Sequence, residues 1–435
     1  MRKQKFTRDE TTTILIACLF NLANAMSAVF MNVYLYAYTG SLIVMSVYTI
    51  VRIGLFPLFF TLGGKWAQKH SFAGPLATGL VFIMLSLLFV LAAQDQFAVH
   101  PELVYGVAAL TGIGEGLFWL SLNSLNQIVS SPQSRSRFLS SVGICNNIAA
   151  IAAPLISTMI IDLAASDTAG YVEIFKIVLV IYAGIALISL RVKARSAPQP
   201  FSVLKRMKLD DPQWRYCMIT TFFYGMHNSL SLTLAGLLVY NATQGSGSTY
   251  GKLLAFFALI SIVAFALVSR AMHRRNRMTF YRIGAVLIAS SAVVLVLCPT
   301  LGGAVYYGVV NALSTPMYAN PYQIIVMNAI ADYAAQENIV GRVIVRETYQ
   351  SIGGCLGILT YAAANELVSL AQNWSGMLTQ VEGFFDQMEA LFARAMDLLP
   401  LSVVGTVEDT VNALIQRLQA VDPTALLSAA KAATD

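Results

Sequence analysis

Two charged residues lie deep inside long apolar stretches of the sequence. Arg52 interrupts the run VYTIVRIGLFPLFF, and Glu115 lies in GIGEG. An unpaired charge in hydrocarbon surroundings costs about 2.5 to 3.5 kcal/mol or more, so two opposite charges at similar depth favour a pair. We therefore predict an Arg52–Glu115 ion pair. Three alternatives follow. The pair holds two helices together, or Glu115 exchanges a proton with an affinity set by Arg52, or Arg52 instead faces lipid headgroups or a substrate alone.

Polar and aromatic side chains recur at helical spacing in four stretches. Residues three, four or seven positions apart share one face of a helix, so each stretch carries one polar stripe. Such a stripe either bonds one helix to its neighbour or faces a ligand cavity. The stripes are Asn21 and Asn24; Trp119 and Asn126, with Glu115; Tyr224, His227, Asn228 and Ser231; and Asn311, Tyr318 and Tyr322.

The remaining reactive residue types favour neither an enzyme nor a metal protein. The four His are scattered, and the sequence has no paired carboxylates and no phosphate-binding Gly loop. The five Cys stand singly, without metal-ligand spacing, and we predict that they are packing residues. We expect no catalytic residues, no metal and no cofactor.

The stripes and the charge pair require helices in a membrane to position them. Of the 435 residues, 57% are hydrophobic and only 11% are charged, which is more apolar surface than one water-soluble core buries. Helices of about 20 apolar residues cross a bilayer. We predict an all-α polytopic membrane protein with eleven spans, at 11–37, 41–62, 73–93, 102–127, 138–163, 173–191, 215–240, 250–270, 279–299, 302–328 and 344–371.

Charge distribution orients these spans. Most of the 28 Lys and Arg lie in the amino-terminal segment and in the connections after every second span. By the positive-inside rule, the amino terminus is cytoplasmic and the protein is a multi-pass component of the cell membrane. The net charge of +6 is then explained by loops that face anionic lipid headgroups, and we expect no nucleic-acid partner.

Internal repetition divides the chain into two halves. NAMSAVFMNVYLYAYTGS, from Asn24, is similar to NSLSLTLAGLLVYNATQGS, from Asn228, and further basic turns repeat at nearly the same offset. We predict an amino-terminal transmembrane half (1–191), a basic cytoplasmic linker (192–213), a carboxyl-terminal transmembrane half (214–371) and an acidic amphipathic tail (372–435). The charged stretch 383–404 makes a twelfth crossing costly, so we expect eleven crossings, with the tail outside the cytoplasm.

In this plan the sequence resembles the major facilitator superfamily (MFS). Two six-span halves, a cytoplasmic amino terminus and a basic central loop are typical of that family. Its signature turn is present in a degenerate form as GKWAQKHS, in which Gly64 and Lys69 match, Gln68 replaces an acid and Ser71 replaces a Gly. The expected cytoplasmic gate residues are Gly64, Lys69, Arg137, Arg342 and Arg346.

The resemblance implies a central cavity lined by spans one, four, seven and ten, the spans that carry the four polar stripes. The stripe residues are therefore the predicted substrate-binding residues. Drug exporters of the family usually have an Arg where this chain has Gly112, which separates it from their proton-antiport pattern. A cavity rich in aromatic residues and Asn favours efflux of lipophilic or amphipathic compounds by a monomeric secondary transporter, with the proton as the candidate coupling ion. The alternatives are sugar or nutrient uptake and a lipid-linked flippase.

Overall fold

The structure is a computed structural model that describes residues 6–129, 135–194, 203, 207, 209, 211–273, 275–298, 300–331 and 339–372. These residues form long helices, and no β-strand occurs among them. Met1–Met207 and Asp211–Ala363 belong to one compact unit, and every contact discussed below lies within it. The predicted tail and most of the predicted linker lie outside the described residues, and the four-part division of the chain stays a prediction.

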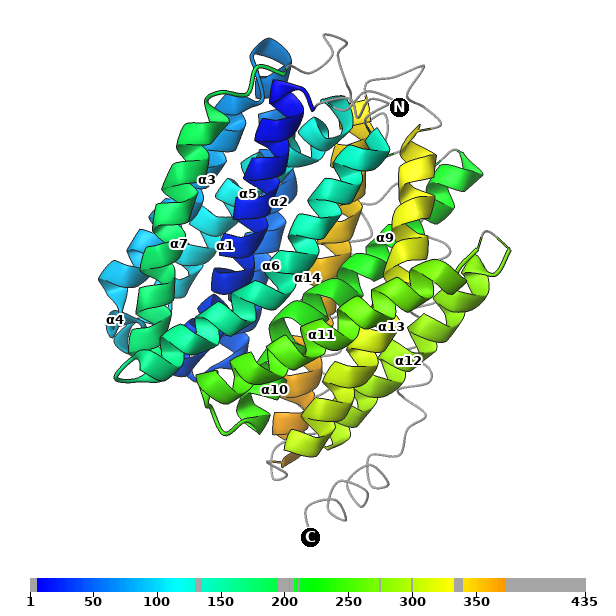
Figure 1. Cartoon of the computed structure of the whole chain (residues 1–435). Coiled ribbons are helices and arrows are strands. Elements are labelled where there is room, and N and C mark those ends of the chain that lie inside the picture. The colour runs from blue at the N-terminus through cyan, green and yellow to red at the C-terminus, as the bar shows by residue number, and fades with distance from the viewer. Residues whose placement is uncertain are drawn as a thin grey trace. The chain divides into compact units, whose positions relative to one another are not determined.

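The described residues of the amino-terminal part form seven helices (Figure 1): α1 (Arg8–Thr39), α2 (Leu42–Lys69), α3 (Ala73–Ala93), the short α4 (Gln96–Val99), α5 (Leu103–Ile128), α6 (Arg135–Leu163) and α7 (Asp167–Ser189). Local sequence sets their ends. Thr7 and Glu10 form a capping box that satisfies free N–H groups at the start of α1. Gly40 ends the same helix with φ at 61°, in the left-handed region that glycine adopts without strain.

The carboxyl-terminal part begins at Pro212, where the fixed φ of proline suits the first turn of a helix. Its elements are α9 (Pro212–Leu230), a π-helical segment η1 (Ser231–Ala235), α10 (Gly236–Ala242), α11 (Gly247–Ala271), α12 (Arg277–Leu297), α13 (Leu301–Ala331) and α14 (Ile339–Gln372). Helix α13 continues through Pro316 and Pro321, although each proline removes one backbone donor. All eleven predicted spans are therefore helical over most of their length.

Eight of the described helices are long and apolar enough to cross a membrane, judged by length and composition: α1, α2, α3, α5, α6, α7, α11 and α12. The predicted spans seven, ten and eleven correspond to α9–η1–α10, α13 and α14. The exact number of crossings stays a prediction. Large apolar side chains such as Leu58, Val180 and Val286 are more than half exposed, which fits a surface that faces hydrocarbon.

Within the compact unit, the helices pack in two sets, one from the earlier and one from the later part of the chain. Helix α5 packs against α2 and α3, and α1 packs against α6 and α7. In the later part of the chain, α13 packs against α11 and α12, and α11 also packs against α6. The first set has an aromatic core in which Phe20 of α1 stacks on Phe118 of α5, with ring centroids 3.8 Å apart. These contacts fix the helices that carry the predicted site.

Candidate functional site

Arg52 and Glu115 form the ion pair that the sequence predicts. Arg52 Nε donates to Glu115 Oε2 at 2.8 Å, and Arg52 Nη2 donates to Glu115 Oε1 at 2.5 Å. The Arg52 side chain is 26% exposed and that of Glu115 is 12% exposed. This two-point geometry holds both groups in a fixed orientation and is stronger than a single neutral hydrogen bond. Whether the pair takes part in transport stays a prediction.

Glycines in GIGEG explain why the two side chains can meet. A Cβ on Gly112 would lie 2.4 Å from the Arg52 carbonyl oxygen, and one on Gly116 would lie 2.7 Å from the Phe56 carbonyl oxygen. Any larger residue at these positions would force α5 away from α2, because small residues let membrane helices approach closely. Gly112, which marks the departure from the exporter pattern, therefore has a packing role here.

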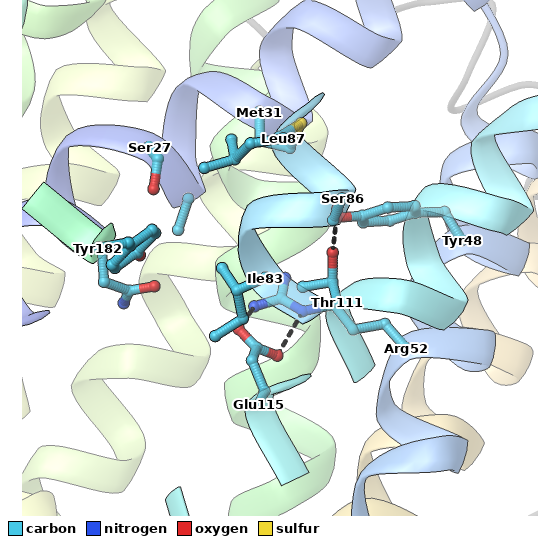
Figure 2. A pocket seen from close by; sticks show the side chains of 12 residues that line it. Ser27, Met31, Tyr48, Arg52, Ile83, Ser86, Leu87, Thr111, Glu115 and Tyr182 are labelled. Atoms are coloured by element: carbon cyan, nitrogen blue, oxygen red, sulfur yellow. Dashed lines mark hydrogen bonds and ion pairs between the residues drawn. The ribbon is translucent and has the colours of Figure 1, made fainter. Parts of the chain in front are cut away.

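Arg52 and Glu115 line a small cavity (Figure 2). Its volume is about 40 Å³, enough for one or a few water molecules. Side chains from α1, α2, α3, α5 and α7 line it. The polar ones are Asn24, Ser27, Tyr48, Arg52, Ser86, Thr111, Glu115 and Tyr182.

Polar residues extend the site beyond the charge pair. Ser86 Oγ and Thr111 Oγ1 lie 2.7 Å apart, beside Arg52 in Figure 2. Sequence reasoning missed both of them, together with Ser27 and Tyr182. Tyr48 carried a usable signal, because it lies one helical turn before Arg52 and so shares its face.

A second polar and aromatic cluster lies on α9 and α13. Tyr224 stacks on Tyr322 with ring centroids 4.0 Å apart and an interplanar angle of 14°. His227 Nε2 lies 3.2 Å from the Tyr318 hydroxyl oxygen, and the Ser231 hydroxyl lies 3.4 Å from the His227 ring nitrogens. The structure thus brings together five residues of two predicted stripes. The π-helical segment begins at Ser231, and such segments often occur at functional sites.

The other predicted substrate-binding residues have separate surroundings. Asn24 lines the small cavity, whereas Asn21 donates a hydrogen bond to Asn146 of α6. Trp119 packs edge-on against Phe20, with ring centroids 5.2 Å apart. The remaining three, Asn126, Asn228 and Asn311, are partly buried.

The predicted gate residues have different surroundings in the structure. Gly64 is buried in α2, and Lys69 is exposed at the last position of that helix. The Arg342 guanidinium lies over the Trp214 ring at 4.6 Å, and Arg346 Nη2 donates to Glu347 Oε1 at 2.5 Å. Arg137 lies in α6, but its side chain is outside the described part of the chain.

The amino-terminal and carboxyl-terminal helices meet in a region that we call the closing contact, formed by Asp162, Asp167, Gly247 and Lys252. The Gly247 N–H donates to Asp167 Oδ2 at 2.6 Å, and Lys252 Nζ lies 3.3 Å from Asp162 Oδ2. A Cβ on Gly247 would lie only 2.1 Å from the Tyr171 hydroxyl. Asp167 of α7 thus meets the first residue of α11, where a helix attracts negative charge. Asp162 of α6 pairs with the Lys252 side chain in the second turn of α11.

Comparison with known proteins gives one family and one fold. The sequence profile of the Major Facilitator Superfamily matches residues 13–358. The Bacillus subtilis (strain 168) relative "Uncharacterized protein YqgE" is 25% identical over 349 residues, 80% of each chain. A Geobacillus stearothermophilus relative, "Uncharacterized protein in sodM 3'region", is 25% identical over 173 residues, 40% of this chain and 79% of the relative.

Solved structures with the same fold include several transporters. An inward-facing bacterial homologue of the human lysosomal transporter Spinster aligns with a TM-score of 0.59 at 14% identity, covering 89% of this chain and 87% of its own. An inward-facing bacterial homologue of the iron transporter ferroportin aligns with a TM-score of 0.59 at 16% identity, covering 82% and 92%. A point mutant of the nucleoside transporter NupG aligns with a TM-score of 0.58 at 12% identity, covering 81% and 89%. At these identities the likeness shows the fold alone.

Proposed function

Because this chain belongs to the major facilitator superfamily, we propose that it exports small lipophilic or amphipathic compounds across the cell membrane, in exchange for protons bound at Glu115. The protein is a multi-pass membrane transporter and not an enzyme. Beyond membership of this family, we propose a substrate class, a direction of transport, a coupling ion, and a location in the plasma membrane with the amino terminus in the cytoplasm.

The observation that carries the proposal is the Arg52–Glu115 pair at the wall of a small cavity. A carboxylate held by two hydrogen bonds from one guanidinium is stable while it is charged. Protonation of Glu115 would remove that attraction and leave the Arg52 charge poorly compensated in a membrane. Arg52 must then turn toward cavity water or another polar group. Proton binding is therefore linked to a rearrangement between α2 and α5, which is what coupling requires.

The aromatic cluster on α9 and α13 supports the substrate class. Tyr224, Tyr318 and Tyr322 present ring faces and edges near His227. Aromatic faces bind flat apolar groups by stacking and bind cations through their negative faces. A compound with an apolar body and a weakly polar or cationic head suits this surface better than a polyanion does.

The closing contact supports alternating access. It joins the end of α6 and the start of α7 to the start of α11. Under the positive-inside orientation, these helix ends lie on the extracytoplasmic side. The described state is then sealed toward the outside, and export requires the closing contact to open.

The proposal is tested by transport into inside-out membrane vesicles from cells that produce the protein and from cells with an empty vector. A panel of fluorescent lipophilic cations, neutral dyes, radiolabelled sugars and nucleosides is supplied outside the vesicles, with an acid interior. We expect uptake of the lipophilic compounds only, and its loss when a protonophore collapses the pH gradient. Uptake of sugars or nucleosides alone would contradict the proposed substrate class, and uptake unaffected by the protonophore would contradict proton coupling.

A further inference from the structure

Helix α6 is exposed on two sides, one apolar and one polar. Ile144, Ile148, Leu155 and Met159 are between 47% and 63% exposed and recur at helical spacing, so they form one apolar stripe. Such a stripe suits contact with lipid tails. Asn146 is also exposed, but it lies two residues after Ile144 and therefore about 200° around the helix axis from it.

The face of α6 that carries Asn146 is buried toward the end of the helix and exposed nearer its start. Ala153 and Ser157 are 0% exposed and Ile161 is 3% exposed, in a helix that packs against α11. Ala150, one turn after Asn146, is exposed. Under the positive-inside orientation, the exposed part is the cytoplasmic half of α6. Amide groups are costly to expose to hydrocarbon, so this part of the face borders water and not lipid.

Asn146 meets Asn21 of α1 on this face, and we call the two side chains the amide pair. Asn21 Nδ2 donates a hydrogen bond to Asn146 Oδ1. Among the described residues, neither Asn21 Oδ1 nor Asn146 Nδ2 has a further hydrogen bond. Since an Asn amide carries one acceptor oxygen and two N–H donors, the amide pair offers a ligand one acceptor and one donor side by side.

We propose that the amide pair holds an uncharged carboxamide-type group of the transported compound, such as an amide, a urea or a lactam. The ligand oxygen accepts from Asn146 Nδ2, and the ligand N–H donates to Asn21 Oδ1. The inference rests on the proposed function, because it specifies the polar head of the lipophilic compounds. It also assigns to Asn146 a role in substrate specificity.

The surroundings of the amide pair favour an uncharged group over an ion. No Asp, Glu, Lys or Arg occurs at positions 11–39 of α1 or 138–161 of α6. Arg52 and Glu115 are paired with each other. An ionised head would therefore lie within the membrane without an opposite charge, which is costly. An amide instead exchanges its hydrogen bonds to water for two matched hydrogen bonds to the protein.

The test compares naphthamide with methyl naphthyl ketone, which has the same rings and carbonyl group but no N–H. Binding to the purified full-length protein is measured at equilibrium, so the result depends neither on the direction of transport nor on protons. We expect the amide to bind about 2- to 12-fold more tightly, because the ketone leaves Asn21 Oδ1 without a donor. Asn146→Leu and Asn21→Leu should each remove this preference. Ile148→Leu, on the apolar stripe, is the matched control that should keep it.

A second measurement leaves both Asn side chains in place, in case the Leu variants do not fold. In a Cys-free background, Ala150→Cys places one thiol a turn away from Asn146, and Ile148→Cys places one on the apolar stripe. An impermeant maleimide is added to inside-out vesicles, which present the cytoplasmic side. We expect labelling of Ala150→Cys only. Naphthamide should slow this labelling at concentrations about 2- to 12-fold lower than the ketone does.

Several results would overturn the inference: no binding of either probe to the native protein, equal affinity for the two probes, a preference that survives Asn146→Leu and Asn21→Leu, or no labelling of Ala150→Cys. The amide pair would then only join α1 to α6. Failure of the proposed function gives a different result. Preferential binding of the amide without proton-driven uptake into vesicles would contradict proton-coupled export and support the amide site.

Discussion

Replacing Gly247 by Ala is expected to open the closing contact. The added Cβ would lie 2.1 Å from the Tyr171 hydroxyl oxygen and 2.9 Å from Tyr171 Cζ. Ordinary contacts of this kind are about 3.5 Å or longer, so the two helices must separate by roughly 1 Å. Tyr171 cannot easily retreat, because it is 1% exposed and stacked on Phe30 with ring centroids 5.5 Å apart.

The expected free-energy cost follows from the size of this overlap. Adding a methyl group to a well-packed contact costs about 1 to 3 kcal/mol. The cost applies only to the state in which the contact is closed, because Tyr171 and Gly247 belong to helices on opposite sides of it. At about 1.4 kcal/mol per factor of ten, the population of the open state rises by roughly 5- to 150-fold.

The assay measures access to the cavity from outside the cell. In a Cys-free background, Asn24→Cys places a single thiol at the small cavity, and an impermeant maleimide is added to right-side-out vesicles. Gly247→Ala is expected to raise the labelling rate by about the same factor as the open population. Gly184→Ala is the matched control, since a Cβ there would meet nothing within 4 Å.

A second variant tests whether the overlap with the Tyr171 hydroxyl causes the faster labelling. Tyr171→Phe, added to Gly247→Ala, removes the hydroxyl oxygen at 2.1 Å and leaves the Cζ contact at 2.9 Å. The labelling rate should therefore fall part of the way back to that of the protein with Gly247. An unchanged rate in Gly247→Ala, or equal rates with and without Tyr171→Phe, would refute the reasoning.

Three further substitutions test other parts of the site. Tyr224→Leu is expected to weaken binding of aromatic substrates by about 2- to 10-fold, because a stacked aromatic pair contributes about 0.5 to 1.5 kcal/mol; equilibrium binding that gives an unchanged affinity would exclude this role. Arg342→Met should lower the stability of the folded protein by about 0.5 to 2 kcal/mol, because the cation–π contact with Trp214 is lost. In thermal unfolding, Trp214→Leu should then lower the stability of the Arg342→Met protein by less than it lowers that of the native protein. Arg52→Lys keeps the positive charge but loses the two-point hydrogen bond to Glu115. The melting temperature should therefore fall, while pH-dependent transport persists. Loss of the pH dependence would show that a positive charge at position 52 is not sufficient for proton coupling.

The fold could be predicted from the sequence because membrane spans depend on local composition. The apolar runs, the basic turns and the repeat were enough to predict the helices and the family. The Arg52–Glu115 pair was also predictable, because two opposite charges at similar depth in a membrane have a lower free energy when they pair than when each is alone. Gly112 and Gly116 were visible as well, but their role in bringing α5 close to α2 emerges only when the packing is known.

Contacts that depend on helix rotation could not be predicted. Asn21 and Asn24 were assigned to one stripe, yet Asn21 bonds to Asn146 and Asn24 lines the cavity. Residues of the closing contact likewise lie far apart in the chain. Their partners are set by how each helix is turned about its axis, and one sequence without related sequences does not show this.

The central claim is that Glu115 carries the proton that drives transport. The most direct measurement follows substrate and proton movement together in vesicles that contain the purified native protein or the Glu115→Gln variant, which keeps the shape of the side chain but cannot ionise. We expect substrate to drive proton movement in the native protein. In the variant, substrate should still bind, with no proton movement and no response of transport to pH. Full proton-coupled transport by Glu115→Gln would contradict the account and leave the Arg52–Glu115 pair with a structural role only.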